Sequence, residues 1–119
     1  MLIQAADRKH GVVSNMRGGE GEITWNNFTP EKMPTHVRFM GVATINPGCS
    51  VGSHQHFDEC EIYFYLAGEA TLDDNGTERL AHPGDISICY SGEQHGIANH
   101  GTEPVQMLAF VSTDAPVGE

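Results

Sequence analysis

Two histidines and a glutamate lie close together in the stretch between Gly48 and Gly68. They are His54, His56 and Glu61. Side chains two residues apart in a β-strand point to the same face, so His54 and His56 could bind one ion together. Glu61 follows after a short connection, at the start of an apolar run. The spacing therefore predicts a mononuclear metal site.

The composition indicates one small domain that must position these ligands. A chain of 119 residues can bury about two thirds of its unfolded surface in a single core. Its 14 glycines and its charged fraction of 18% favour a turn-rich β fold over a helical bundle. With 16 acidic and 6 basic residues, its net charge of -10 would repel a phosphate backbone. We therefore expect no nucleic-acid partner.

The cysteines and the apolar segments bear on the compartment. The chain has 3 cysteines and no CxxC pair, which favours reduced thiols over a disulfide framework. It shows neither the pattern of a signal peptide nor an apolar run long enough to span a bilayer. We expect a cytoplasmic protein without membrane contact.

Short extended runs separated by turns predict about eight β-strands, arranged as a sandwich or jelly roll. Residues 37–45 are rich in apolar and β-branched side chains and end at an Asn-Pro-Gly turn. Asn75 and Gly76 separate two further extended runs, which is typical of a hairpin. The metal stretch thus lies between predicted strands.

The strand at 37–45 has two candidate inner faces. One contains Arg38 and Met40, and it would bury a charge without a partner. If it did face inward, Arg38 could anchor an anion. We prefer the other face, which consists of Val37, Phe39, Gly41, Ala43 and Ile45.

Residues 61–66 are largely apolar on both faces of the predicted strand. A strand of this kind needs a covering layer on each side, and a second copy of the chain could supply one, so we expect a homodimer. Tyr63 shares a face with Glu61 and is a candidate catalytic residue, although a core role for it is equally open. Phe39 and Tyr65 are further candidates for substrate contact.

Two motifs give the chain a resemblance to a small single-domain cupin. The first motif comprises Gly48, His54, His56, Glu61 and Gly68. The second comprises Gly84, Gly92, His95 and Asn99, with Tyr90 where the family has proline. The resemblance covers about residues 39–111. It implies an all-β double-stranded β-helix, or jelly-roll barrel, over 37–119, with 1–36 as an N-terminal arm and loop of the same domain.

The resemblance also implies a set of metal ligands: His54, His56, Glu61 and His95. Three imidazoles and one carboxylate suit a borderline divalent ion such as Fe, Mn, Ni, Co or Zn, and an octahedral ion would keep two positions open. Asn99 is expected to hold the corner that follows His95.

Such a site favours a small oxygen-rich ligand. A divalent ion with one carboxylate ligand leaves a formal charge of about +1, which suits an organic acid or a diol. Among cupin reactions we expect a dioxygenase first, with isomerase, decarboxylase and lyase as alternatives, and Tyr63 as proton donor or substrate clamp. The competing hypothesis is a non-catalytic module that binds a small molecule or a metal, because no evident general base accompanies the ligands. We favour an enzyme.

Overall fold

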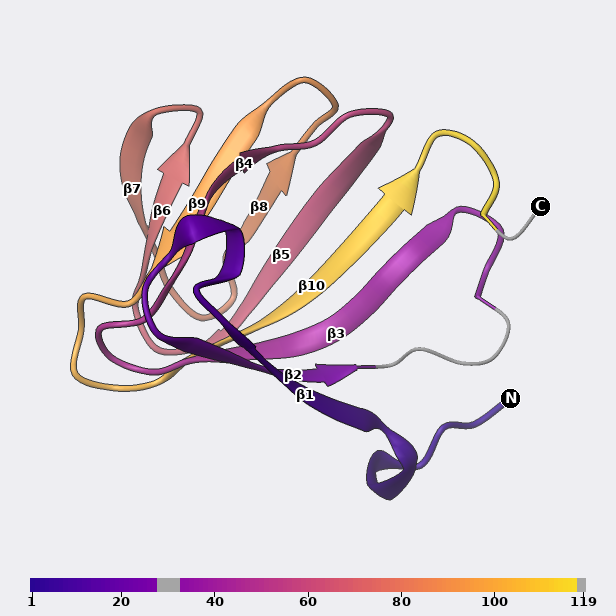
Figure 1. The fold of residues 1–119 in the computed structure, drawn as a ribbon, viewed down its shortest axis with the longest axis horizontal. Helices are drawn as coiled ribbons and strands as arrows, with labels where there is room; N and C mark the ends of the chain where they lie inside the picture. The colour runs from indigo at the N-terminus through magenta and orange to yellow at the C-terminus, as the bar shows by residue number, and fades with distance from the viewer. Residues whose placement is uncertain (28–32, 118–119) are drawn as a thin grey trace.

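The computed structural model describes residues 1–27 and 33–117, and within them it contains ten β-strands and no α-helix (Figure 1). The all-β prediction is therefore confirmed. Two short 3₁₀ helices, η1 (Ala5–Asp7) and η2 (Met16–Gly18), accompany the strands. The strands are β1 (Lys9–Ser14), β2 (Glu22–Asn27), β3 (Val37–Ile45), β4 (Ser50–Gln55), β5 (Glu59–Ala67), β6 (Ala70–Asp74), β7 (Thr77–Ala81), β8 (Ile86–Cys89), β9 (Gln94–Ala98) and β10 (Val105–Thr113).

The strands form two antiparallel sheets. The larger sheet has the order β1-β2-β3-β10-β5-β8, and the smaller has the order β4-β9-β6-β7 (Figure 1). Neighbours such as β4 and β9, or β3 and β10, are far apart in sequence, as in a jelly roll. This topology makes His54 of β4 and His95 of β9 cross-strand partners. Among the described residues, no helix has the length and apolarity to cross a bilayer.

The core lies between the sheets and follows the two-residue alternation of the strands. On β3 the preferred inner face is confirmed, because Gly41, Ala43 and Ile45 are buried. Phe39 is half-buried on the same face and packs edge-to-face against Trp25, with ring centroids 5.1 Å apart. Arg38 is exposed, but its side chain also lines the cavity beside the candidate ligands, and it forms an ion pair with Glu59.

The N-terminal segment contributes two strands to the larger sheet. In β2 the buried residues Ile23 and Trp25 alternate with less buried neighbours, and Trp25 pairs with Ala43 of β3. The turn between β1 and β2 carries η2, which contacts β4. A β-carbon at Gly52 of β4 would collide with the backbone oxygen of Arg17. The turn therefore lies close against the strand that bears His54.

Asn99 holds the corner after β9. It is fully buried, and its side-chain amide donates to the carbonyls of Ile45, at 2.9 Å, and Glu103, at 2.7 Å. Its side-chain oxygen accepts from the backbone N–H of Gly101 at 2.9 Å. The expected structural role of Asn99 is confirmed.

We predict that Gly52→Ala destabilises the fold, because the new methyl group must displace the backbone of the η2 turn. Overpacking of this kind costs about 1–3 kcal/mol of unfolding free energy, which urea denaturation would measure. Gly11→Ala on β1 is the matched control, since a β-carbon there meets nothing within 4 Å. Equal stability of the two variants would show that the turn does not rest on β4.

Candidate metal centre

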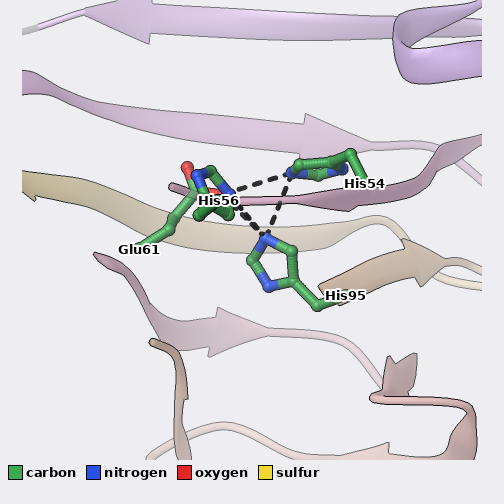
Figure 2. Close-up of side chains that lie close together, drawn as sticks. All are labelled: His54, His56, Glu61 and His95. Carbon is green, nitrogen blue, oxygen red and sulfur yellow. Dashed lines mark hydrogen bonds and ion pairs between the residues drawn. The ribbon is translucent and has the colours of Figure 1, made fainter. Parts of the chain in front are cut away.

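Four side chains from three segments meet between the sheets: His54 from β4, His56 just beyond its end, Glu61 from β5 and His95 from β9 (Figure 2). His56, Glu61 and His95 are buried, and His54 is half-buried. A hydrogen bond fixes the backbone of His56, because its N–H donates to the carbonyl of Glu93 at 3.2 Å. The motif residues predicted from the sequence are therefore brought together.

The groups that could bind an ion face one another. Nε2 of His95 lies 3.1 Å from Nε2 of His54, 3.1 Å from Nε2 of His56 and 2.9 Å from Oε1 of Glu61. The Nε2 atom of His56 lies 3.2 Å from the same oxygen, and that of His54 lies 3.7 Å from it. All four ligand atoms fall within 4.8 Å of one another.

These separations fit a shared transition-metal ion. Ligand atoms bound about 2.1 Å from one ion lie about 3.0 Å apart at octahedral right angles and about 3.4 Å apart at tetrahedral angles. Four of the separations are between 2.9 and 3.2 Å. The cluster could hold a divalent metal, and the spacing is nearer to the octahedral value.

The electrostatics of the cluster keep Glu61 ionised. Burial alone would raise the pKa of its carboxyl group, but hydrogen bonds with His54, His56 and His95 hold that pKa well below its usual range. Burial lowers the pKa of His95, whereas the hydrogen bond with Glu61 raises that of His56. A neutral imidazole beside a carboxylate is the state in which both groups bind metals.

Outer contacts orient two of the rings. Nδ1 of His54 lies 2.8 Å from the carbonyl of Gly52, which can only accept a hydrogen bond. Nδ1 of His56 lies 2.7 Å from Oε2 of Glu59. Both rings thus carry their proton on Nδ1 and turn Nε2 toward the cluster.

A cavity of about 300 Å³ opens beside the cluster, and His54, His56 and Glu61 contribute to its wall. Tyr63 and Phe39, two of the residues proposed for substrate contact, also line it. The ring of Tyr63 stacks on that of His95 with centroids 4.8 Å apart and an angle of 11° between planes. The hydroxyl of Tyr63 is 3.5 Å from Nε2 of His95.

Tyr65 lies elsewhere. It is buried on the same face of β5, but its hydroxyl is 2.8 Å from Oγ of Ser87 and it does not line this cavity. The substrate contact predicted for Tyr65 remains a prediction.

The wall also contains residues that the preferred sequence interpretation did not assign to the site, among them Arg38, which it named only as a conditional anion anchor. Met16, Arg17 and Trp25 of the N-terminal segment line the cavity, and so does Arg38. The indole N–H of Trp25 donates to the sulfur of Met16 at 3.4 Å, which holds the turn over the wall. The alternation of apolar residues around Trp25 was the available signal for a strand there.

Tyr90, which replaces the proline of the second motif, makes a contact that proline cannot make. Its backbone N–H donates to Oε1 of Glu93 at 2.9 Å, and the N–H of Glu93 donates back to the carbonyl of Tyr90 at 3.0 Å. Proline lacks the N–H group. The turn that leads to His95 is therefore closed by a hydrogen bond to the Glu93 side chain, where the family has the rigid ring of proline.

Comparison with known proteins identifies the family of this fold and site. The family model described as a cupin domain matches residues 41–111 of the sequence. The chain belongs to the cupin family. This cupin is 36% identical over 112 residues to an oxalate-binding protein of Thermotoga maritima, and the match covers 93% of each chain.

A second curated relative and two solved structures are also similar to this chain. The tetracenomycin polyketide synthase protein TcmJ of Streptomyces glaucescens is 26% identical over 97 residues, which cover 82% of this chain and 65% of that protein. A crystal structure of a Thermotoga maritima protein described as a predicted oxalate decarboxylase has a TM-score of 0.89 at 35% identity, covering 95% of this chain and 99% of that one. A cupin 2 conserved barrel domain protein from Salinispora arenicola has a TM-score of 0.67 at 30% identity, covering 78% and 76% of the two chains.

Loading with a metal should stabilise the protein. We expect Mn²⁺ or Co²⁺ to raise the melting temperature above that of chelator-treated protein, because the ion binds only the assembled quartet. An ion at about 100 times its Kd adds about 2.7 kcal/mol, or roughly 10 °C for a domain of this size. Calorimetric melting curves with and without chelator measure the shift.

In His95→Ala the two curves should coincide, whereas His82→Ala, which changes an exposed histidine, should keep the parent's shift. Coincident curves for the parent protein would contradict the metal site.

Proposed function

We propose that this cupin binds a small oxygen-rich acid, with oxalate as the first candidate, through a divalent transition metal held by His54, His56, Glu61 and His95. The observation that carries the proposal is the convergence of these four side chains, three of which, His54, His56 and Glu61, line a cavity. The relative of known ligand class, the Thermotoga oxalate-binding protein, supports the choice of acid. The bound ion would supply open coordination positions and Lewis acidity.

The charge of the cavity wall favours an anion. Among the described residues that line it, Arg17 and Arg38 are cationic and Glu61 alone is anionic. A divalent ion would add two further positive charges at the wall of a chain whose net charge is -10. An acid with two carboxylates is attracted there and repelled by most of the remaining surface.

The size of the cavity favours a small ligand. Its volume of about 300 Å³ is at the lower end of the range for ligand pockets, about 300–1,000 Å³. Phe39 and Trp25 supply apolar surface on one side, which excludes water from the ligand. Phe39 is thus proposed as a packing contact.

Tyr63 is proposed to donate a hydrogen bond to the bound acid. Burial raises the pKa of its hydroxyl well above the usual value, so the phenol keeps its proton near neutral pH. The hydroxyl faces the cluster at 3.5 Å from Nε2 of His95. An oxygen of a ligand in the cavity can accept that proton in a hydrogen bond.

Decarboxylation is the second candidate function, and the position of Tyr63 favours it. Conversion of the oxalate dianion to carbon dioxide and formate breaks the C–C bond and consumes one proton, for which the Tyr63 hydroxyl is a buried donor. The similarity of this chain to a protein described as a predicted oxalate decarboxylase supports decarboxylation over dioxygenation. The dioxygenase reaction expected from the sequence draws no support from these relatives.

We also propose a homodimer formed through the outer face of β5 and β8. Phe64, Leu66, Ile86 and Ile88 are each at least 38% exposed there, and these outward positions carry no charge. Two copies with a charge of -10 each can approach most easily through an uncharged surface. Burying large apolar side chains is the usual basis of a stable interface.

A cytoplasmic location remains our proposal. Cys49, Cys60 and Cys89 are free thiols. Reduced cysteines are typical of that compartment.

Isothermal titration of oxalate into the metal-loaded protein tests the function. We expect saturable binding near one equivalent, and its loss both in His54→Ala and after chelation, because the acid binds through the ion. Tyr63→Phe should keep its metal content and weaken oxalate binding about 10- to 150-fold, the equivalent of one hydrogen bond to a charged group.

Formate release and oxygen uptake, measured on the same samples, separate decarboxylation from oxygenation. Tight metal binding without oxalate binding would refute the ligand assignment, and turnover unchanged in Tyr63→Phe would remove Tyr63 from the reaction.

Light scattering at micromolar concentration tests the dimer. We expect about twice the chain mass of 12.9 kDa for the parent and one chain mass for Phe64→Asp, which places a charge in the apolar face. Leu80→Asp alters an exposed residue of the other sheet and should stay dimeric. A parent with the mass of a single chain would refute the dimer.

A further inference from the structure

Glu59 connects a residue of β3 to a histidine of the metal centre. Its carboxylate accepts two hydrogen bonds from Arg38, at 2.9 Å from Nε to Oε1 and 3.0 Å from Nη2 to Oε2. Oε2 also accepts from Nδ1 of His56 at 2.7 Å. The side chain of Glu59 is 16% exposed. Glu59 is outside the ligand quartet but contacts one of its members.

The contact selects one form of the His56 ring. An ionised carboxylate only accepts hydrogen bonds, so Nδ1 carries the proton and Nε2 keeps its lone pair. Nε2 is the atom that lies 3.2 Å from Glu61 and 3.1 Å from His95. The hydrogen bond from Nδ1 therefore directs the metal-binding nitrogen of His56 at the other ligands.

His54 offers an internal comparison. Its Nδ1 proton goes to a backbone carbonyl, that of Gly52, at 2.8 Å. A charged carboxylate attracts this proton more strongly than a neutral carbonyl and makes the opposite ring nitrogen a stronger donor to metal. The two histidines of the first motif thus differ in the acceptor of their Nδ1 proton, and His56 makes the stronger hydrogen bond.

Arg38 determines the direction of Glu59. β10 lies between β3 and β5 in the sheet, so the side chains of Arg38 and Glu59 together span two strand spacings, about 9.6 Å. The planar guanidinium group binds both carboxylate oxygens, which fixes the plane of the carboxylate as well as its position. The Arg38 side chain is 48% exposed, and an ion pair so open to solvent contributes little to folding.

We propose that Glu59 is a positioning residue of the metal centre, that Arg38 orients it, and that together they set the affinity of His56 for the ion. This inference rests on the metal site proposed above. It extends that site, because neither Glu59 nor Arg38 is a ligand, and one of them belongs to a strand that supplies no ligand.

The experiment measures Co²⁺ binding to metal-free protein by calorimetry, together with the visible absorption of the bound ion, which reports its ligand geometry. Glu59→Gln should weaken Co²⁺ binding by about 10- to 100-fold and change the absorption spectrum. Arg38→Met leaves the carboxylate present but unheld, so its loss should be smaller. The double variant should bind as Glu59→Gln does, because Arg38 acts only through Glu59.

Two matched control variants distinguish the positioning effect of Glu59 from two other effects. These are the loss of a nearby negative charge and the loss of any pair between a glutamate and a histidine. Asp58→Asn removes one negative charge beside Glu59, and asparagine tolerates the positive φ of 59° at that position. Glu69→Gln alters an exposed pair with His82, 2.9 Å long, whose two residues are outside the quartet. Both variants should keep the parent's spectrum and bind Co²⁺ within about twofold of the parent, as surface changes usually do.

The outcomes are distinguishable. A parent protein that binds no Co²⁺ refutes the metal site and this inference with it. A parent that binds Co²⁺, with Glu59→Gln equal to it in affinity and spectrum, refutes the positioning role alone. Additive losses in the double variant would show that Arg38 does not act through Glu59 and would overturn the proposed connection. Arg38→Met, an exposed change, provides the test should Glu59→Gln fail to fold.

Discussion

Three imidazoles converge on one buried carboxylate oxygen, Oε1 of Glu61, and the rest of the structure depends on this convergence. An ionised carboxylate at 8% exposure is stable only where donors or cations surround it. The imidazoles come from β4, from the residue just after it and from β9, and the carboxylate comes from β5 of the other sheet. The two sheets must therefore hold a constant separation at this point, and the side chain of Asn99 helps by tying the end of β9 to the end of β3.

The ligands could be predicted because their chemistry depends on short-range spacing. His54 and His56 are two residues apart, and the motif that contains Glu61 is only 21 residues long, from Gly48 to Gly68. The inner face of β3 followed from the cost of burying Arg38 without a partner. His95 was different, because only the resemblance to cupins connected it with ligands about 40 residues earlier in the chain.

Other features required the three-dimensional structure. Alternation placed Tyr63 and Tyr65 on one face of β5, but it could not say how far along the barrel each hydroxyl would reach. One hydroxyl faces His95 and the other faces Ser87. The role of Glu59 could not be predicted from the sequence either, since an acidic residue in a short connection is usually solvated. Its neighbour Arg38 comes from a strand that is not adjacent in the sheet.

The carbonyl of Gly52 that holds His54 belongs to the main chain, and this has an evolutionary consequence. No codon change removes a main-chain oxygen, and the crowding at Gly52 admits little besides glycine. The carboxylate that holds His56 is encoded by its own codon and can be exchanged in one step. Among descendants of this gene, the hydrogen bond to Nδ1 of His54 would stay constant and that to Nδ1 of His56 would vary. Divergence in metal preference would therefore accumulate at position 59, while position 52 stayed the same.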